Sequence, residues 1–180
     1  MKVARANMDV AAVNGKLYAI GGTLTDVHAP LSINEEYDPA NDSWTFKTPM
    51  PTERCMFAVV VYRNKIYCIG GVARINGSIR VTGLNQVYDP ATDSWGTKTP
   101  MPTPRSFITA NVIDGKICVM GGMSDKTIGG VSENDNSIVN VNEVYDPAND
   151  SWTTKACMSI GTTMYASASV DNKNIHYRWR

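Results

Sequence analysis

Few side chains in this sequence have the types and spacing that catalysis requires. Histidine, the commonest general base, occurs only at His28 and His176 among 180 residues. No HExxH, GxSxG or GxxxxGK[ST] motif is present, so the zinc, acyl-transfer and phosphate-binding arrangements that these motifs provide are missing from the sequence. The sequence therefore predicts no catalytic residue, no metal site and no cofactor.

The cysteines show no metal-ligand spacing either. Two of the four lie inside the apolar segments KIYCIGG and KICVMGG, where a free thiol behaves like a small hydrophobic side chain. None belongs to a CxxC pair. We interpret all of them as apolar fillers rather than as a disulfide framework or a zinc site: Cys55, Cys68, Cys118 and Cys157.

The balance of charge argues against some classes of partner. The 17 Lys and Arg residues are matched by 17 Asp and Glu residues, so no global field would collect nucleic acid or an anionic membrane. No apolar run approaches the ~20 residues that span a bilayer, and the opening MKVARANMDV lacks the apolar core of a signal peptide. We expect a soluble protein without nucleic-acid or membrane partners. Its compartment stays open, because a signal peptide encoded upstream would direct export.

The strongest pattern is an internal repeat. A lysine-led apolar segment ending in Gly-Gly occurs as NGKLYAIGG, NKIYCIGG and DGKICVMGG. Each is followed by a Tyr-Asp-Pro turn and a tryptophan, in YDPANDSW or YDPATDSW, which places Trp44, Trp95 and Trp152 at equivalent positions. Four methionines are also equivalent, with spacings of 49, 51 and 57 residues: Met1, Met50, Met101 and Met158.

Each repeat predicts four short antiparallel strands. The first strand is an apolar run, over residues 8–13, 57–62 and 108–113, and the second begins at Lys16, Lys65 or Lys116. Asn-Gly, Arg-Asn or Asp-Gly joins them, and such residues favour two-residue hairpin turns because they tolerate positive φ. Proline cannot donate to a strand ladder, so the chain reverses at Tyr-Asp-Pro before the tryptophan strand.

A four-stranded sheet that is apolar on both faces cannot bury either face alone. Such sheets become stable when they stack radially, as in a β-propeller. The paired glycines allow close backbone approach, and the recurring Tyr and Trp supply packing surface between sheets. The tryptophans would alternatively form a platform on which a ligand stacks. We therefore predict an all-β partial propeller of three four-stranded blades plus the first hairpin of a fourth.

Gly-Gly, a tyrosine, and a tryptophan after a turn together resemble the kelch repeat family, in bacterial-type arrays or in kelch-BTB adaptors. The repeats then cover residues 1–49, 50–100 and 101–157, with an incomplete fourth over 158–180. Three blades are fewer than the ~4–8 that close a propeller. The resemblance therefore indicates part of a larger kelch protein, or a homodimer that completes a six-bladed ring.

Three arginines precede the first strand of successive repeats: Arg5, Arg54 and Arg105. In kelch-BTB adaptors such arginines rim the central channel and grip acidic peptides, so the resemblance implies that these three bind a ligand. Arginine suits this role because its hydrogen bonds to carboxylates are charge-assisted and often bidentate. The structural alternative is that each arginine caps carbonyl groups of a neighbouring blade.

Only one connection changes length between repeats. From each Gly-Gly to the next Tyr there are 14 residues (23–36), 16 residues (72–87) and 22 residues (123–144). In an antiparallel meander these connections lie at the same end as the inter-blade linkers with their arginines, and we predict that this end recognises a partner. Drift in unconstrained loops is the alternative. In the third connection, Asp125, Glu133 and Asp135 lack the regular oxygen spacing of a calcium loop.

The last residues depart from the repeat. After MSIGTTMYASASVDNK, the repeat requires a strand like Ile-Tyr-x-Ile-Gly-Gly, but the sequence continues NIHYRWR. One allowed coding string for residues 173–180 reads Lys-Ile-Tyr-Ile-Ile-Gly-Gly when a single A is deleted. Our hypothesis is that residues 174–180 are out of frame. Resequencing the locus tests it.

These features favour a binding or scaffold module without catalysis. The expected partner is a protein, an acidic peptide or a glycan, bound at the end that carries the variable loops and arginines. Kelch propellers also include copper-dependent galactose oxidases and a sialic acid mutarotase, so the resemblance leaves a fragment of an enzyme as the alternative. The scarcity of histidine argues against copper.

Overall fold

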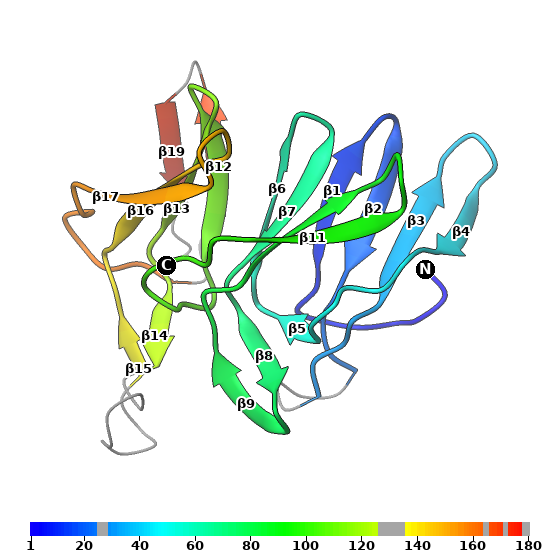
Figure 1. Cartoon of the computed structure of the whole chain (residues 1–180), viewed down its shortest axis with the longest axis horizontal. Helices are drawn as coiled ribbons and strands as arrows, with labels where there is room; N and C mark the ends of the chain where they lie inside the picture. The colour runs from blue at the N-terminus through cyan, green and yellow to red at the C-terminus, as the bar shows by residue number, and fades with distance from the viewer. Residues whose placement is uncertain (25–28, 126–135, 164–165, 171–172, 178–180) are drawn as a thin grey trace.

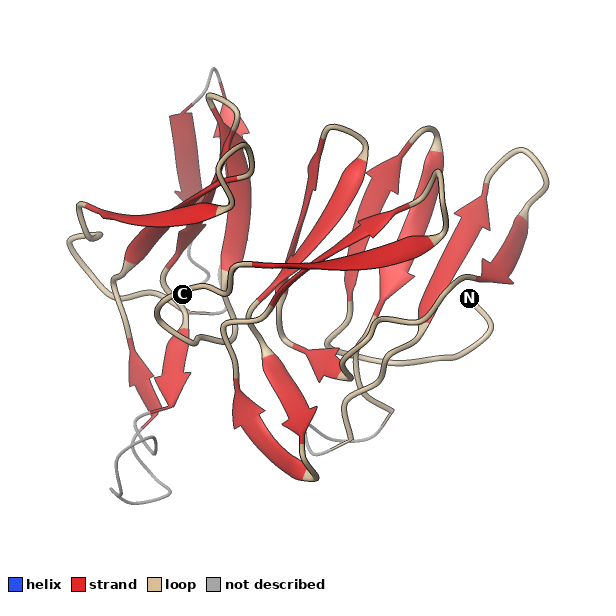
Figure 2. Cartoon of the chain, in the orientation of Figure 1, coloured by secondary structure: helices blue, strands red, loops and turns tan. Residues whose placement is uncertain are grey.

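The computed structural model of the chain describes residues 1–24, 29–125, 136–163, 166–170 and 173–177. Within these residues all regular structure is β-strand (Figure 2), which confirms the predicted fold class. The described residues contain no helix with the length and apolarity needed to cross a membrane.

Three four-stranded antiparallel sheets follow one another along the chain (Figure 1). Blade 1 consists of β1 (Asp9–Val13), β2 (Lys16–Ile20), β3 (Asn34–Asp38) and β4 (Ser43–Phe46). Blade 2 consists of β6 (Ala58–Tyr62), β7 (Lys65–Ile69), β10 (Asn85–Asp89) and β11 (Ser94–Lys98). Blade 3 consists of β12 (Thr109–Ile113), β13 (Lys116–Met120), β16 (Asn142–Asp146) and β17 (Ser151–Lys155).

Shorter strands complete the fold. Strands β18 (Ala166–Val170) and β19 (Lys173–Tyr177) form the predicted hairpin of a fourth blade, and β18 packs beside β12. The connections after the second strands of blades 2 and 3 carry their own hairpins, which the sequence did not predict. These are β8 (Val72–Ile75) with β9 (Ser78–Val81), and β14 (Met123–Asp125) with β15 (Asn136–Ile138). Strand β5 (Arg54–Cys55) pairs with β8.

The predicted turns have the expected backbone conformation. Both residues of the first hairpin turn have positive φ, at 52° for Asn14 and 75° for Gly15. Arg63-Asn64 and Asp114-Gly115 repeat this pattern. The third strands end at the aspartate of Tyr-Asp-Pro, as predicted. Each first strand begins one residue later than its apolar run.

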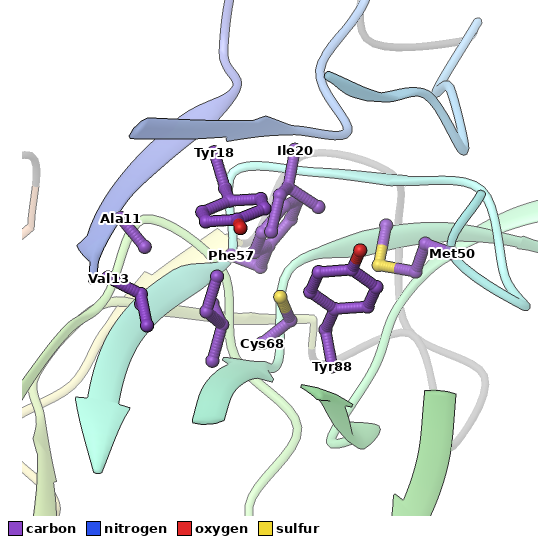
Figure 3. Close-up of a cluster of buried hydrophobic side chains, with 9 residues drawn as sticks. Ala11, Val13, Tyr18, Ile20, Met50, Phe57, Cys68 and Tyr88 are labelled. Carbon is purple, nitrogen blue, oxygen red and sulfur yellow. The ribbon is translucent and has the colours of Figure 1, made fainter. Parts of the chain in front are cut away.

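Apolar side chains fill the space between adjacent blades, and Figure 3 shows the cluster between blades 1 and 2. Tyr18 and Ile20 of blade 1 face Phe57, Cys68 and Tyr88 of blade 2 there. An equivalent cluster between blades 2 and 3 contains Tyr67, Ile69, Ile117 and Tyr145. Each blade therefore buries one face against the next, as radial stacking requires.

The Gly-Gly pairs sit where blades come closest. A Cβ atom built on Gly70 would lie 2.6 Å from the carbonyl oxygen of Arg105, and one on Gly21 would lie 2.5 Å from that of Arg54. Both glycines have positive φ. The close backbone approach that the sequence predicted is therefore confirmed.

The two ends of the blades differ. In Figure 1 the hairpins β8–β9 and β14–β15 project from one end, and the turns β1–β2 and β6–β7 lie at the opposite end. We call the first end, with residues 5–7, 23–24, 29–33, 51–57, 72–84, 102–108, 123–125 and 136–141, the loop face, and the opposite end the turn face. The predicted separation of variable connections from constant turns is present.

Some sequence predictions lie beyond what the structure describes. Residues 126–135, with Glu133 and Asp135 of the calcium question, are outside the described ranges. Residues 178–180 are too, and His28 with them. Residues 174–177 belong to β19, and the out-of-frame hypothesis for 174–180 stays a hypothesis.

Candidate functional site

The three recurring arginines lie at the loop face with buried side chains. The exposed fraction of Arg54 and of Arg105 is 0%, and that of the Arg5 side chain is also 0%. Each guanidinium points into its own blade, where the second strand ends and the third begins.

Arg54 is held by backbone carbonyls of blade 2. Its Nη1 donates to the carbonyl oxygens of Cys68 and Gly70, both at 3.2 Å, and of Leu84 at 3.1 Å. Its Nη2 donates to Oε1 of Gln86 at 2.9 Å and contacts the sulfur of Met50 at 3.1 Å. Burial lowers the pKa of Arg54 to about 10.

The other two arginines face a carboxylate in place of the Gln86 amide. Arg105 donates to Oε2 of Glu143 at 2.8 Å and to the carbonyl oxygen of Gly121 at 2.7 Å. Arg5 pairs with Glu35 and donates to the carbonyl oxygen of Ala19 at 2.8 Å. In both ion pairs the side chains are almost fully buried.

The backbones of Arg54 and Arg105 also bond to the preceding blade. The N–H of Gly22 donates to the carbonyl of Arg54 at 2.9 Å, and the N–H of Gly71 to that of Arg105 at 2.8 Å. The same residue thus bonds to one blade through its backbone and to the next through its side chain. At the fourth position Gly122 bonds to Thr162, which has no guanidinium.

The structural alternative predicted that each arginine caps carbonyl groups of a neighbouring blade. The arginines do cap carbonyl groups, but these belong to the arginine's own blade. The guanidinium groups already have partners in the described structure, and a ligand would have to displace them. The ligand-binding role of Arg5, Arg54 and Arg105 therefore stays a prediction. Their side-chain partners were not predicted, although the residue two before the tyrosine of Tyr-Asp-Pro is Glu or Gln in all three repeats.

The bases of the variable connections are held by the same hydrogen bonds despite their different lengths. The N–H groups of Leu31, Thr82 and Val139 donate to the carbonyl oxygen of the second glycine of the Gly-Gly pair in their own blade, at 2.8, 2.9 and 3.0 Å. All differences in length thus fall within residues 23–30, 72–81 and 123–138. The blades hold the bases of these loops in one geometry, and the excursions beyond them differ.

A groove of about 480 Å³ lies on the loop face of blade 2. It runs between the linker residues Pro51, Thr52 and Glu53 and the β8–β9 hairpin, with Leu84 at its base. Arg74 lies on its wall, with Nε 3.0 Å from Oε2 of Glu53. Both side chains are exposed, at 41% and 46%. Sequence reasoning did not single out these two residues, because neither recurs in the other repeats.

A pocket of about 130 Å³ lies among Tyr62, Arg63, Lys65, Tyr67, Pro147 and Ala148. No group of three or more His, Cys, Asp or Glu side chains in the described ranges could hold a metal ion.

The recurring tyrosine, aspartate and tryptophan form a clamp on the preceding repeat. Tyr88 donates its hydroxyl proton to Oδ1 of Asp93 at 2.6 Å, and that carboxylate accepts the N–H of Thr48 at 2.9 Å. Nε1 of Trp95 donates to the carbonyl of Thr48 at 2.9 Å. Tyr145, Asp150 and Trp152 hold Thr99 in the same way. We call each set an exit clamp, because Thr48 and Thr99 follow the fourth strand of a blade.

The exit clamps explain the tryptophans of blades 2 and 3. The rings of Tyr88 and Trp95 lie 5.0 Å apart, and those of Tyr145 and Trp152 lie 5.1 Å apart. The hydrogen bond from Tyr145 is the largest influence on Asp150 and lowers the pKa of its carboxyl. Packing between blades, rather than ligand stacking, is the role these two tryptophans have here.

The cysteines are free in the described structure. Burial raises the pKa of Cys68 to about 12 and that of Cys55 to about 11, so neither thiol is reactive at neutral pH. Cys68 is fully buried, as predicted, whereas Cys118 is half-buried and Cys157 is exposed.

Four-stranded blades that stack face to face, each joined to the next by its linker, define a β-propeller. The Kelch motif model matches residues 4–51, 53–102 and 104–159, and this chain therefore belongs to the kelch-repeat family.

The chain is similar to longer kelch proteins. It is 32% identical over 164 residues to beta-scruin of Limulus polyphemus, covering 88% of this chain and 17% of that protein. It is 27% identical over 179 residues to kelch repeat and BTB domain-containing protein 12 of Homo sapiens, covering 91% of this chain and 28% of that protein. The solved structure of YjhT matches with a TM-score of 0.82 at 18% identity, over 96% of this chain and 56% of that chain, and shows the fold alone.

Proposed function

We propose that the chain is a binding module that recognises a protein or peptide on its loop face. The observation that carries the proposal is the constant geometry at the bases of the variable connections. The same hydrogen bonds pin their bases in all three blades, while the excursions differ in length and sequence. Loops on a rigid scaffold can change their ligand without changing the fold.

The groove beside the β8–β9 hairpin is the proposed centre of this surface. Arg74 and Arg80 are both exposed on the hairpin. The hairpin therefore favours a partner with acidic residues, because arginine forms charge-assisted hydrogen bonds with carboxylates. Arg5, Arg54 and Arg105 support the loop face of their own blades, through the carbonyls that they bond at the loop bases.

A selection from a displayed random peptide library on the immobilised chain tests the proposal. We expect acidic peptides to be enriched, and their affinity, measured by fluorescence anisotropy, to fall at least tenfold in Arg74→Glu/Arg80→Glu. Lys65→Glu is the matched control, since Lys65 is an exposed cation on the turn face. Equal loss in both variants would contradict the assignment to the loop face.

The same preparation separates binding from the enzyme alternative. NMR of sialic acid anomers mixed with the chain shows whether their interconversion is accelerated. A rate that rises in proportion to protein concentration would overturn a purely binding function.

A further inference from the structure

A small pocket opens on the turn face between blades 2 and 3. It has a volume of about 130 Å³, and its walls come from the β6–β7 hairpin of blade 2 and from the turn that follows β16 in blade 3. Blade 2 contributes Tyr62, Arg63, Lys65 and Tyr67, and blade 3 contributes Pro147 and Ala148. Apolar walls with a few polar groups among them are typical of sites for small ligands.

The backbone of Arg63 has a conformation that suits its equivalents in the other blades better. Its φ is 49°, in the left-handed region, and the same turn position is occupied by Asn14 in blade 1 and by Asp114 in blade 3. Asparagine and aspartate visit this region more readily than a long side chain does, because their short polar side chains hydrogen-bond locally. Arginine therefore strains the turn. Strain of this kind collects at functional sites, where the residue serves through its side chain.

The charge of Arg63 is not compensated within the described part of the chain. Its guanidinium lies over the ring of Tyr62, with Cζ 5.2 Å from the ring centroid, and no carboxylate of the described residues pairs with it. Lys65 on the pocket wall differs, since its Nζ lies 2.7 Å from Oδ2 of Asp89. The pocket thus presents one cation in excess, which favours a ligand with a single negative charge.

The hydroxyl of Tyr67 is an unused donor in the same pocket. Only 6% of Tyr67 is exposed, and its hydroxyl makes no hydrogen bond to the residues that the structure describes. The equivalent Tyr18 donates to Oε2 of Glu36 at 2.6 Å, but Tyr67 faces Val87 across the ladder in place of that glutamate. Burial raises the pKa of Tyr67, so the hydroxyl keeps its proton. A buried donor without an acceptor costs free energy, which a ligand oxygen in the pocket would recover.

We propose that this pocket binds a small organic acid through its carboxylate. Arg63 binds the carboxylate oxygens with charge-assisted hydrogen bonds, Tyr67 donates a further hydrogen bond, and the apolar walls contact the hydrocarbon part of the acid. A monoanion matches the single excess cation, whereas a phosphate dianion would leave one charge unpaired. The volume of the pocket limits the ligand to a small acid.

This site lies at the opposite end of the blades from the loop face, so it stands independently of the proposed peptide binding. Saturation-transfer difference NMR of the full chain with acetate, propionate and butyrate tests it. We expect saturable binding, with an affinity that rises about fourfold for each added methylene group until the pocket is filled, because each methylene buries apolar surface. Absence of saturable binding for all three acids would overturn the proposal.

Inorganic phosphate is the competing anion in the same experiment. We expect it to displace propionate only weakly, because the apolar walls give it nothing to contact. An affinity for phosphate equal to or above that for propionate would overturn the choice of a carboxylate.

Substitutions in the pocket identify the two donors. Arg63→Asn gives the turn the residue that blade 1 has there, so the fold is retained and the melting temperature should not fall. We expect it to weaken propionate binding at least about tenfold, since the charge-assisted hydrogen bonds are lost. Tyr67→Phe should weaken binding about two- to tenfold and leave the melting temperature unchanged, because its hydroxyl has no partner among the described residues.

Tyr18→Phe is the matched control. It removes the equivalent hydroxyl of blade 1, which already donates to Glu36, so it should lower the melting temperature and leave the affinity for propionate unchanged. Lys16→Gln removes a cation from the turn face outside the pocket and should also leave the affinity unchanged. A loss in Lys16→Gln as large as that in Arg63→Asn would show general attraction to the face and contradict the pocket. Unchanged binding in both Arg63→Asn and Tyr67→Phe would contradict it as well.

Discussion

The buried arginines differ in the group that each faces across its blade. Arg105 faces the Glu143 carboxylate, whereas Arg54 faces the neutral amide of Gln86. Arg105→Ala leaves a buried carboxylate without its cation, which costs about 3–5 kcal/mol of unfolding free energy. Arg54→Ala leaves only neutral acceptors, so we expect a cost at least about 1 kcal/mol smaller. Urea denaturation monitored by tryptophan fluorescence measures both.

A second substitution tests this explanation. Adding Glu143→Gln to Arg105→Ala removes the orphaned charge and should recover about 1–2 kcal/mol. Glu143→Gln alone is the control, and we expect it to destabilise the protein, since Arg105 then loses its anion. If the double variant is no more stable than Arg105→Ala, charge burial is not the cause.

The clamp aspartate makes stability depend on acid pH. The hydrogen bond from Tyr145, with further bonds from Thr99 and despite opposing desolvation, lowers the pKa of Asp150 below its ordinary value of 3.8. A carboxyl with a lowered folded-state pKa contributes stability above its unfolded-state pKa and loses it as pH falls through the folded-state value.

We therefore expect Asp150→Asn to lower the free energy of unfolding by about 1 kcal/mol at neutral pH. Between about pH 5 and about pH 2 its stability should fall less than that of the original chain. Denaturation curves across this range measure the difference. Parallel pH profiles for the two proteins would rule out the clamp as a source of acid sensitivity.

At the scale of strands and turns, the Gly-Gly pair controls how closely blades approach. Gly70 and Gly77 both have positive φ, at 69° and 78°, but only Gly70 has a neighbour within van der Waals distance. Gly77→Ala should lower the free energy of unfolding by about 1 kcal/mol, because it strains the backbone. Gly70→Ala should cost about 1–3 kcal/mol more, because its Cβ would meet the carbonyl of Arg105. Thermal denaturation compares them, and equal losses would show that strain alone matters.

Local patterns explain which elements could be predicted. Asn-Gly, Tyr-Asp-Pro and Gly-Gly each restrict φ or remove a donor over two or three residues, so they place turns and strand ends from the sequence. The β8–β9 and β14–β15 hairpins escaped prediction because they do not recur at a fixed length. Asn76-Gly77 was the available signal, since it has the composition of a hairpin turn and positive φ at both residues.

The candidate site was predictable as a face but not as a set of residues. Strand alternation alone places the variable loops and linkers at one end of the blades. The contacts that bury the arginines join residues far apart in sequence, as Arg105 and Glu143 do across 38 positions. Glu53 and Arg74 come together only because the β8–β9 hairpin folds back along the linker.

The whole molecule is a row of blades in which each contacts only its neighbours. Blade 2 is covered on both faces, by the cluster toward blade 1 and the cluster toward blade 3. Blade 1 has one covered face, and its other face exposes Val10, Leu17 and Phe46. In such an array stability is the sum of blade and interface contributions, so a blade with two interfaces opens less readily than a blade with one.

Amide hydrogen exchange should therefore vary along the chain. We expect β7 of blade 2 to exchange more slowly than its equivalent β2 of blade 1, because opening β7 breaks two interfaces and opening β2 breaks one. Mass spectrometry of exchanged peptides covering 16–20 and 65–69 measures this. Equal exchange in the two peptides would mean that the blades unfold as a single cooperative unit.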